Sequence, residues 1–319
     1  MEGEGSEPLA KREVRFGIVT AWPQEDWHSR RLVAACARRG TSVVIDPSAL
    51  AAFVNDSTVE VRLGNRVAST VDALVLARGL GRGGDPDVQF EIYRALEGTG
   101  ALVVNGIDAL LAAQDKLRTS WLLHRAGVPT PPAAAAQTCR EALTALAAME
   151  SAVLKPIAGS LGEGVVRVES GPPGRRRILE ALKRDGAVYM QQYVAHPGRD
   201  ARLFVVGGSV VGAMERVATS GEWRTNVECG ARVLPLRPNG AFARVAVQAA
   251  GALGLDWAGV DIVMSSGGPT VLEVNGNPSW VGILQATGED MAEPIAEHVW
   301  ARARQRGENT RDHAGKNHG

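Results

Sequence analysis

The chain opens with apolar runs that alternate with amphipathic segments. Residues 14–20 are mostly apolar and predict a strand, and the helical pattern after it ends at Gly40. The same alternation continues with expected strands at 42–45, 71–77 and 101–104 and an expected helix at 88–97. Strands that alternate with helices favour a parallel sheet with helices on its faces.

The pattern changes at Gly106. Two helical segments, 106–113 and 115–125, end in a proline-rich stop at 127–132, and a small α+β unit is expected beyond it. Its expected elements are a helix at 140–149, strands at 151–155 and 165–168, and a helix at 175–184. The last third predicts a strand at 188–192, hairpins at 201–217 and 258–275, a helix at 241–253, a terminal helix at 289–304 and a loose polar end.

Composition narrows the class of protein. The 319 residues are 45% hydrophobic and 22% charged, which is typical of a packed soluble protein. Lys plus Arg and Asp plus Glu both number 35, so the basic excess that binds nucleic acid or an anionic membrane is missing. The three cysteines form no close pair, the N-terminal residues lack a signal-peptide pattern, and no apolar run is long enough to cross a bilayer. We therefore expect a cytoplasmic protein that binds neither nucleic acid nor a membrane.

The last of the expected hairpins brings two carboxylates together. Counting outward from a pair formed by Met264 and Thr270 places two acids directly opposite each other. They are Asp261 and Glu273, and a period of two puts Asn275 on the same face. Two carboxylates about 5 Å apart repel each other unless a cation or a proton lies between them. Because oxygen ligands without His or Cys favour Mg²⁺ over Zn²⁺, the hairpin predicts a magnesium site.

A second interpretation of this hairpin needs no metal, because one of the acids pairs with an arginine such as Arg202 or Arg232. The two interpretations differ in how substitutions of the two acids should affect the stability of the metal-free protein. Under the metal interpretation, repulsion between the carboxylates predicts that Asp261→Ala or Glu273→Ala leaves the metal-free protein as stable as before, or slightly more stable.

Another candidate site follows the strand at 151–155. Lys155 ends this strand, and the next loop carries Gly159, Gly162 and Gly164, whose N–H groups suit a polyphosphate. It is not a Walker A loop, because no Lys-Ser/Thr pair follows Gly164 and a strand comes next instead of a helix. A glycine-rich turn without a ligand is the alternative.

Other catalytic classes are disfavoured. Residues 79–84 (GLGRGG) fit the dinucleotide pattern GxGxxG, but Asp85 and Pro86 interrupt the entry to the next helix. No acid that could bind a ribose ends the following strand, which argues against a dehydrogenase. Hydrolysis by a side-chain nucleophile is disfavoured as well, because the chain has no GxSxG elbow and its histidines form no metal motif.

Seven motifs occur in a fixed order along the chain. They are Asp115-Lys116; Lys155-Pro156 with Gly159, Ser160, Gly162, Gly164 and Val165; Gln191-Gln192-Tyr193-Val194; Gly198, Asp200 and Arg202; Arg224-Thr225-Asn226; Ala258-Gly259-Val260-Asp261; and Glu273-Val274-Asn275. In this order they resemble the ATP-grasp ligases of the RimK-like group, the α-L-glutamate ligases. The resemblance covers about residues 14–303, and seven ordered motifs are far more specific than one. Residues 27–29 and 78–81 most resemble the branch that attaches glutamate to the one-carbon coenzyme tetrahydromethanopterin.

The resemblance implies an ATP-grasp fold of class α/β and α+β, with an N-terminal parallel-sheet (pre-ATP-grasp) domain. We accordingly divide the chain into a disordered tail at 1–13, an N-terminal α/β substrate domain at 14–109, a central lid domain at 110–187, a C-terminal domain with the metal site at 188–306, and a disordered tail at 307–319. A homodimer or homotetramer is also implied.

The resemblance further implies a role for each motif. Two lysines would hold the phosphates of ATP, the glycine loop would close over them, and residues 191–194 would bind adenine. The implied cofactors are ATP and Mg²⁺, or Mn²⁺ in its place. The cofactor-binding residues would be Lys116, Lys155, Gly159, Ser160, Gly162, Gly164, Gln191, Gln192, Tyr193, Val194, Asp200, Arg224, Thr225 and Asn226; the catalytic residues Arg202, Arg224 and Asn226; and the metal ligands Asp261, Glu273 and Asn275.

The acceptor is expected at the carboxyl ends of two early strands, where open α/β sheets bind ligands. One strand ends shortly before Trp27 and His28, which could stack on the acceptor, and another runs into Arg78, which suits an anionic group. Both ends should face the ATP site. Arg216 is a further candidate substrate residue, and the alternative for Arg78 is that it caps a helix or pairs with Asp85.

The implied reaction is formation of an amide bond through an acyl phosphate. An amino acid, glutamate or another, would be added through its amine to the carboxylate of a small coenzyme or metabolite. Where the family commonly reads Glu-Val-Asn-Ala-Ser-Pro-Gly, residues 276–280 (GNPSW) follow Asn275, so the loop that borders the amino acid is expected to differ. Two alternatives stay open: a ligase that acts on a peptide or protein terminus, and a non-catalytic ATP-binding protein of the same fold.

Overall fold

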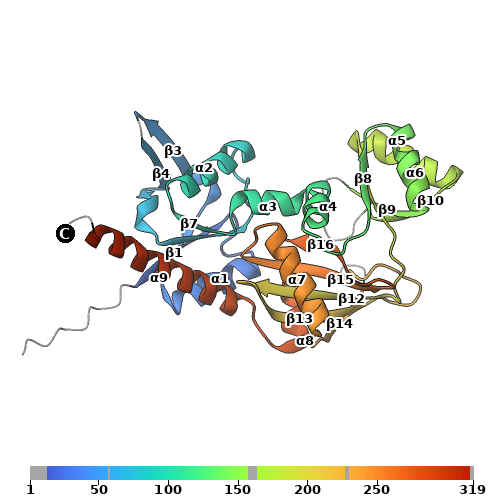
Figure 1. Cartoon of the computed structure of the whole chain (residues 1–319). Helices are drawn as coiled ribbons and strands as arrows, with labels where there is room; N and C mark the ends of the chain where they lie inside the picture. The colour runs from blue at the N-terminus through green and yellow to red at the C-terminus, as the bar shows by residue number, and fades with distance from the viewer. Residues whose placement is uncertain (1–12, 57, 157–163, 227–229, 317–319) are drawn as a thin grey trace, which may run out of the picture. The chain divides into compact units, whose positions relative to one another are not determined.

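The computed structural model of the chain describes residues 13–56, 58–156, 164–226 and 230–316. It forms two compact units, Met1–Val104 with Ile295–Gly319 and Asn105–Pro294 (Figure 1). Residues 1–12 of the tail expected at 1–13 lie outside the described residues. None of the helices in the described part is long and apolar enough to span a membrane.

The first unit is built on a four-stranded parallel sheet. In spatial order its strands are β2 (Gly40–Ile45), β1 (Val14–Thr20), β6 (Ala73–Arg78) and β7 (Leu102–Val104). Helix α1 (Trp27–Ala37) connects β1 to β2, and α2 (Pro86–Gly98) connects β6 to β7. The central strands β1 and β6 are almost entirely buried, as continuous apolar runs predict. The parallel sheet expected from the sequence is confirmed.

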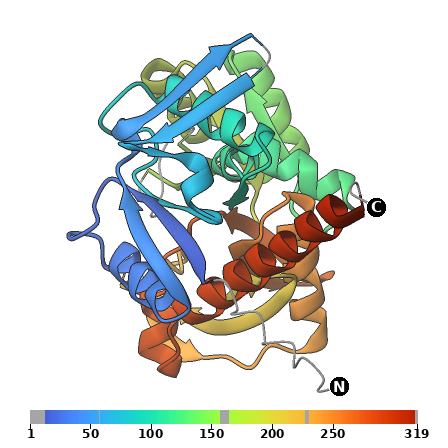
Figure 2. The same cartoon turned by 90° about the vertical axis from the view of Figure 1, so that its left-hand side faces the viewer.

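The segment that connects β2 to β6 along the chain forms a small antiparallel sheet, which the sequence analysis missed. Its strands are β3 (Leu50–Asn55), β4 (Thr58–Leu63) and β5 (Arg66–Val67). The β3–β4 hairpin extends away from the parallel sheet in Figure 2 and packs against α2. Phe53 and Val54 are consecutive and 44% and 75% exposed, so apolar residues lie on both faces of β3 and hide the alternation that would have marked a strand.

The terminal helix is longer than expected. Helix α9 runs over Ala292–Lys316, so residues 307–316 of the segment that was expected to be loose continue the helix, and for them that expectation was wrong; residues 317–319 lie outside the described residues. Packing holds the first half of the helix through Ile295, Ala296, Val299 and Ala303, which are all buried. Once packing has formed the first turns, adding each further residue to the helix changes the free energy little, so a polar sequence can extend the helix.

The second unit contains two antiparallel sheets. The larger one, in spatial order, consists of β14 (Arg232–Pro235), β13 (Ser209–Val217), β12 (Arg199–Val206), β15 (Trp257–Ser265) and β16 (Gly268–Asn275). Helix α7 (Gly240–Ala252) packs across β12, β13, β15 and β16 with Ala246, Ala249 and Ala250 buried. The remaining helices outside the smaller sheet are α3 (Ile107–Gln114), α4 (Lys116–Arg125) and α8 (Val281–Thr287).

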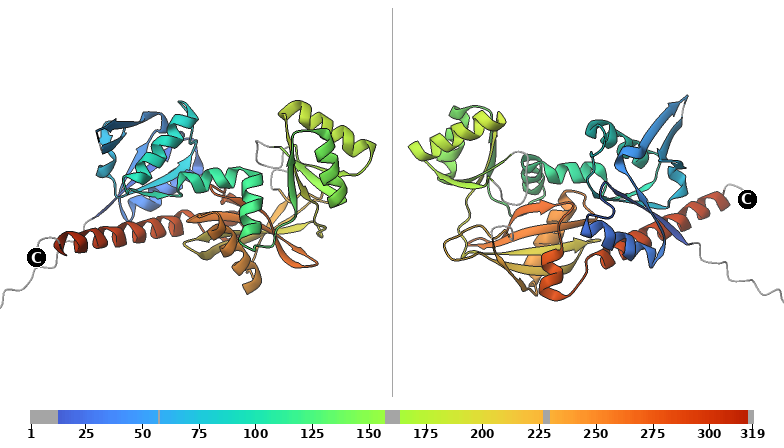
Figure 3. Two further views of the ribbon diagram at one scale, coloured as in Figure 1. Left: turned by 45° about the horizontal axis from the view of Figure 1, so that its top comes forward. Right: turned by 180° about the vertical axis from the view of Figure 1, so that it is seen from behind.

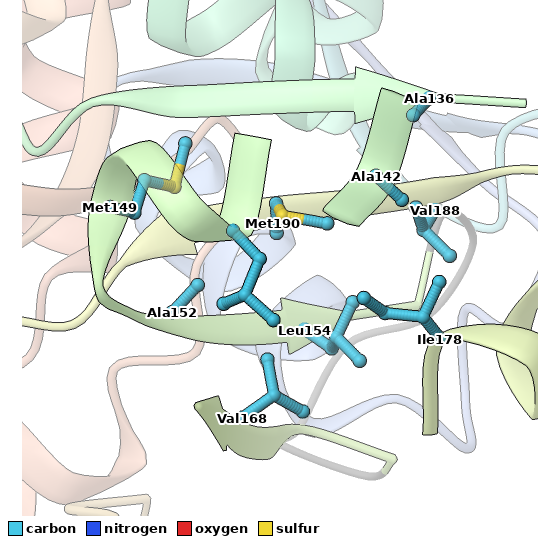
Figure 4. Packing of buried hydrophobic residues seen from close by; sticks show 10 residues of the cluster. Ala136, Ala142, Met149, Ala152, Leu154, Val168, Ile178, Val188 and Met190 are labelled. Atoms are coloured by element: carbon cyan, nitrogen blue, oxygen red, sulfur yellow. The ribbon is translucent and has the colours of Figure 1, made fainter. Parts of the chain in front are cut away.

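The smaller sheet carries its helices on one face. Its strands, in order, are β10 (Val166–Glu169), β9 (Ser151–Lys155), β11 (Val188–Gln192) and β8 (Ala133–Ala136). Figure 3 shows α5 (Cys139–Met149) and α6 (Pro172–Asp185) on that face. Side chains from both helices and all four strands meet in one core, seen in Figure 4: Ala136, Ala142, Met149, Ala152, Leu154, Val168, Ile178, Val188 and Met190.

Alternation along β9 and β11 decides what the other face of the smaller sheet carries. Because Ala152, Leu154 and Met190 point into the core, their neighbours Val153, Lys155 and Gln191 lie on the opposite face. Packing of this sheet therefore directs one lysine and one glutamine away from the helices and toward the candidate site.

A buried asparagine joins distant parts of the second unit. The Nδ2 group of Asn105 donates to the carbonyl oxygens of Trp257 and Gly276, each at 2.8 Å. Its Oδ1 accepts from the backbone N–H groups of Asp256 and Trp257, at 2.7 and 3.0 Å. Asn105 is fully buried and uses both donors and both acceptor sites of its amide, so it fixes the ends of β15 and β16.

We predict that Asn105→Asp lowers the free energy of unfolding by about 3 kcal/mol, because a carboxylate cannot donate to two buried carbonyl groups. Urea unfolding followed by circular dichroism measures the loss. Asn55→Asp makes the same chemical change on the exposed end of β3 and is the control. Equal, small effects of the two substitutions would contradict the role assigned to Asn105.

Candidate active site

A pocket in the second unit is lined by residues of both antiparallel sheets, of α4 and of the segment that precedes β14. It brings together most residues that the sequence singled out: Lys116, Lys155, Gln191, Gln192, Tyr193, Val194, Asp200, Arg216, Arg224, Thr225, Asn226, Asp261 and Glu273. Arg202, Asn275 and Gly164 are not among its lining residues. Gly159, Ser160 and Gly162 lie outside the described residues.

Charged side chains stand opposite one another on neighbouring strands of the larger sheet. Arg202 of β12 is opposite Asp261 of β15, and Asp261 is opposite Glu273 of β16. One step along, Asp200 of β12 is opposite Arg216 of β13. Because Asp200 and Arg202 are two residues apart, both lie on one face of β12. The sheet thereby builds a connected row of charges from β13 to β16.

Two arginines hold the carboxylate of Asp261. Arg202 donates to it from Nε and Nη2, both at 2.7 Å, in the forked geometry that suits a guanidinium and a carboxylate. Arg216 Nη2 lies 2.9 Å from Asp261 Oδ2. Burial alone would raise the pKa of Asp261, but the two guanidinium groups outweigh it and hold that pKa well below its usual range. Asp261 is therefore a buried, fully ionised carboxylate.

The row continues from Arg216 to a second buried acid. Arg216 donates to Asp200 from Nε at 2.8 Å and from Nη2 at 2.5 Å, and Thr225 Oγ1 donates to Asp200 Oδ2 at 2.7 Å. Burial acts to lower the pKa of Arg216, whereas Asp261 and Asp200 raise it above its ordinary value. Arg216, which was expected to contact substrate, thus links two carboxylates inside the protein.

The hairpin places its acids as expected, but by another route. Met264 pairs with Pro269 and Val263 with Thr270, so the expected pair of Met264 and Thr270 was wrong by one residue. The register shifts between Asp261 and Ile262, where Leu272 is an extra residue in β16. This bulge restores the pair of Asp261 and Glu273. The turn is tighter than assumed, and the bulge compensates for it.

The free hydrogen-bonding positions of Asp261, Glu273 and Asn275 decide whether they can hold a hard divalent cation. Glu273 forms no hydrogen bond or ion pair within the described part of the chain, and Asn275 Nδ2 is buried there without a partner. Asp261 uses three of its roughly four acceptor positions, so one remains. Turning the Asn275 amide to present Oδ1 breaks no hydrogen bond of Nδ2, and with that orientation these three residues fit a cation that takes its other ligands from water or phosphate. The described residues contain no cluster of three or more His, Cys, Asp or Glu side chains that could hold a metal without such help.

This geometry supports part of the metal-free interpretation as well. Arg202 does pair with Asp261, while Arg232 lies at the start of β14. Repulsion between Asp261 and Glu273 is therefore already offset by arginines, and for Asp261 we now expect the opposite effect, a loss of stability of the unloaded protein. For Glu273, which makes no such pair, the expectation of unchanged or slightly higher stability stands.

Lys155 reaches the pocket from β9. Its Nζ donates to Gln191 Oε1 at 2.8 Å and lies 3.5 Å from the carbonyl oxygen of the bulge residue Leu272. Burial lowers the pKa of Lys155, the charge of Glu273 opposes this, and Lys116 adds to it. The ammonium group is thus held inside the pocket by two uncharged oxygens.

Aromatic side chains that the sequence analysis missed flank the segment after β11. Trp223 meets Tyr193 edge-on with ring centroids 5.9 Å apart, and His196 lies 6.3 Å from the same ring. The guanidinium of Arg167 lies 4.1 Å from the centre of the Tyr193 ring. Burial lowers the pKa of His196, against the raising effect of Asp200, so its ring is neutral at physiological pH. The position of Trp223 just before the Arg224 motif was the one available signal.

Arg224 is also held in place by an acid. Glu222 accepts from Arg224 Nε and Nη2 at 3.1 and 2.7 Å and from the backbone N–H groups of Trp223 and Arg224 at 2.9 Å. These hydrogen bonds, led by that of the Arg224 side chain, lower the pKa of Glu222 to about 2. Glu222 is therefore ionised over the whole physiological range.

The residues expected to bind an acceptor lie in the first unit. Arg78 ends β6 opposite Thr20 of β1, so the carboxyl ends of both strands meet at one edge of the sheet. Trp27 and His28 open α1 with their rings edge-on at 5.1 Å, and burial lowers the pKa of Arg78 while Asp26 raises it. The structure thus brings the three residues to the same edge.

The glycine run at 79–84 forms a closed loop. Gln89 accepts from the N–H of Gly81 at 2.9 Å and donates to the carbonyl oxygen of Arg82 at 3.0 Å. Asp85 accepts from the N–H of Val88 and so caps α2. The side chain of Gln89, which belongs to α2, thus ties two residues of the loop to that helix.

The departure at residues 276–280 leads into the core. Trp280 is fully buried, packs against Phe204 and Trp257, and donates to Asp290 at 2.9 Å. None of the residues 276–280 lines the pocket. Trp280 of this stretch therefore supports the larger sheet from its core.

Comparisons with known proteins place this chain among ligases. A model of the RimK-like ATP-grasp domain matches residues 113–299. The tetrahydromethanopterin:alpha-L-glutamate ligase of Methanosarcina acetivorans is 34% identical, over 89% of this chain and 98% of that protein. A probable alpha-L-glutamate ligase 2 of Shewanella amazonensis is 33% identical, over 90% and 95%.

Solved structures share the fold at lower identity. The ATP-grasp ligase PsnB, complexed with a minimal precursor, Mg and ADP, superposes with a TM-score of 0.69 at 19% identity, over 91% of this chain and 98% of that one. The D-cycloserine synthetase DcsG gives a TM-score of 0.64 at 21% identity, over 91% and 99%. The ATP-grasp fold expected from the sequence is confirmed.

We predict that Asp261→Ala lowers the free energy of unfolding of the metal-free protein by about 3 kcal/mol, because it leaves the largely buried guanidinium of Arg202 without its carboxylate and removes one of the two carboxylates that Arg216 contacts. Glu273→Ala, the matched control, should change it by less than about 0.5 kcal/mol, since Glu273 has no such partner. Urea unfolding in the presence of a chelator measures both.

The pH dependence has a definite sign. The pKa of Asp261 is lower in the folded than in the unfolded chain, so its stabilisation is complete above about pH 4 and is lost as the pH falls further. The difference between wild type and Asp261→Ala should therefore shrink below pH 4. Equal stability of the wild type and Asp261→Ala at pH 7 would contradict the assigned ion pairs.

Proposed function

The chain belongs to the RimK-like ATP-grasp family and is a carbon–nitrogen ligase, and we propose that it uses ATP to join glutamate to the carboxylate of a small coenzyme. One observation carries the proposal. The pocket of the second unit gathers lysines, arginines and acids whose charges are fixed by the sheet before any ligand arrives. Such a preorganised arrangement suits a reaction in which phosphate charge must be neutralised.

We assign the nucleotide to this pocket. Lys116 and Lys155 would contact its phosphates, and the segment from Gln191 to Val194 would hold adenine through backbone groups. Asp200 with Arg224, Thr225 and Asn226 would complete the site. The assignment is supported by the fact that all of these residues line one pocket.

Asp261, Glu273 and Asn275 would hold Mg²⁺, which when bound neutralises phosphate charge. Arg202 and Arg216 keep Asp261 ionised and fix its orientation, so these arginines prepare the oxygens for a cation. Mn²⁺ offers similar oxygen coordination and is a substitute to be tested.

The reaction then needs no side-chain nucleophile. An oxygen of the acceptor carboxylate attacks the γ-phosphorus of ATP, and ADP leaves with the electrons of the broken bond, which gives an acyl phosphate. The amine of glutamate attacks the acyl carbon, inorganic phosphate departs, and the amine loses a proton as the amide forms. Lys155 and Arg224 would stabilise the negative charge that develops on the phosphoryl oxygens.

A small coenzyme is preferred over a peptide as acceptor. Two of the curated relatives that match about nine-tenths of the chain are named for tetrahydromethanopterin and glutamate, and others of similar coverage are named for glutamate alone. PsnB, which was solved with a precursor peptide, shares the fold at only 17% identity. Arg78, with Trp27 and His28 beside the same sheet edge, would bind the anionic acceptor.

The direct test incubates the purified protein with Mg²⁺-ATP, an amino acid and a panel of carboxylate acceptors, including coenzyme precursors and peptides. ADP should appear in a one-to-one ratio with a new amide detected by mass spectrometry, and only when both substrates are present. AMP in place of ADP, or ADP release without any amide, would contradict the proposal.

We predict that Lys155→Ala lowers kcat/KM for ATP about tenfold or more, because a lysine on the phosphates stabilises bound nucleotide and developing charge. Steady-state kinetics at saturating acceptor and amine measure this. Lys183→Ala, an exposed lysine on α6, should leave kcat/KM unchanged. Wild-type kinetics of Lys155→Ala would remove Lys155 from the nucleotide site.

We predict that Arg78→Ala weakens acceptor binding about tenfold while ATP binding is retained, because a guanidinium holding an anion is lost. Calorimetric titration of the acceptor in the presence of a non-hydrolysable ATP analogue measures it. The control is Arg82→Ala, four residues away, whose guanidinium lies over the Trp22 ring. Unchanged acceptor affinity in Arg78→Ala would move the acceptor site elsewhere.

A further inference from the structure

The side chain of Gln191 contacts Lys155, and this contact is not explained if residue 191 binds adenine only through its backbone. It is one of the few buried polar residues of the second unit, 3% exposed, and its Oε1 accepts from Lys155 Nζ at 2.8 Å. We propose that Gln191 is a positioning residue, which aims the Lys155 ammonium at an anionic ligand without neutralising its charge. This inference rests on the proposed function, in which that ligand is the phosphate chain of a nucleotide.

The contact is built into the sheet. Lys155 pairs with Tyr189 and Gln191 pairs with Val153, so Lys155 and Gln191 are diagonal neighbours on the same face of adjacent strands. Such diagonal positions are about 7–8 Å apart at the backbone, which two long side chains can span. The opposite face of both strands is fixed by the core around Leu154 and Met190, so neither strand can turn its side chains away.

The chemistry fixes which end of the amide faces the lysine. An ammonium group has three donors and no acceptor, so the amide oxygen of Gln191 must point toward it. The carbonyl oxygen of Leu272, at 3.5 Å, is the second oxygen near Nζ. Leu272 is the bulge residue of β16, and the bulge is what leaves its carbonyl out of regular pairing with β15.

Charge balance distinguishes Lys155 from the arginines of the site. Arg202, Arg216 and Arg224 each form an ion pair with a carboxylate. Lys155 has no carboxylate oxygen within 4.0 Å among the residues that the structure describes, although Glu273 acts on it from farther away. Neutral oxygens orient its ammonium group and leave its positive charge for a ligand, whereas a carboxylate at position 191 would compete with that ligand.

The first test is Gln191→Glu, which keeps the oxygen and adds a charge. Titration calorimetry without Mg²⁺, so that the new carboxylate cannot recruit a metal, should show about tenfold or more weaker binding of ADP. Adenosine, which has no phosphate, should bind within about twofold of wild type, since the backbone that holds adenine is unchanged. Gln248→Glu makes the same change on an exposed position of α7 and should leave both affinities unaltered.

The second test separates positioning from a general structural effect. Gln191→Met has nearly the same length without an acceptor, and it should weaken ADP binding about threefold or more. In a Lys155→Met background the same substitution should change ADP affinity by less than about twofold, because the group that it positions is gone. These variants bury no new charge, so they decide the matter even if Gln191→Glu does not fold.

The outcomes distinguish the inference from the function on which it rests. Wild-type ADP affinity in both Gln191→Glu and Gln191→Met would overturn the positioning role while leaving the nucleotide site in place. An equal loss from Gln191→Met with and without Lys155 would make Gln191 a structural residue and overturn it as well. If the wild-type protein bound no ADP at all, the proposed function itself would fail.

Discussion

The constraint on which the site depends is the ion pairing of one buried carboxylate. Asp261 is 4% exposed, and Arg202 and Arg216 keep it ionised. Asp200 holds Arg216 from the other side and itself accepts a hydrogen bond from Thr225. Buried ion pairs seldom add net stability over apolar packing, because desolvation offsets the attraction between charges. Their value here is orientation: they hold an anionic oxygen in one place, beside Glu273, at the centre of a charged pocket.

Strand alternation makes that pocket possible. On β9 and β11 one face builds the core beneath α5 and α6, and the other presents Lys155 and Gln191. On the larger sheet α7 packs across four strands, and the acids and arginines follow each other on neighbouring strands. The bulge at Leu272 connects the two systems, because it restores the pairing of Asp261 with Glu273 and brings a carbonyl oxygen near Lys155.

Sequence patterns predicted those features that repeat with a period. The parallel sheet and the hairpin acids follow from alternation and spacing. The family was expected from a resemblance in the order of the motifs, and the comparisons confirm it. Strand β8 consists of four alanines, which favour a helix over a strand, and only its place beside β11 makes it a strand. The arginine partners of Asp261 could not be ranked, since Arg202 and Arg232 differ only in which strand they face. Trp280 belongs to the stretch that was expected to border the amino acid, and in the structure its side chain packs in the core against Trp257.

The account's central claim is that the carboxylate of the acceptor is activated by phosphorylation in a pocket of fixed charges. The most direct measurement labels both carboxylate oxygens of an accepted substrate with ¹⁸O and analyses the products by mass spectrometry. The account predicts that one ¹⁸O per amide bond appears in inorganic phosphate, because the acceptor oxygen attacks the γ-phosphorus and leaves with the phosphoryl group. Label in AMP, or unlabelled phosphate beside a labelled amide that has lost its second ¹⁸O to water, would contradict it.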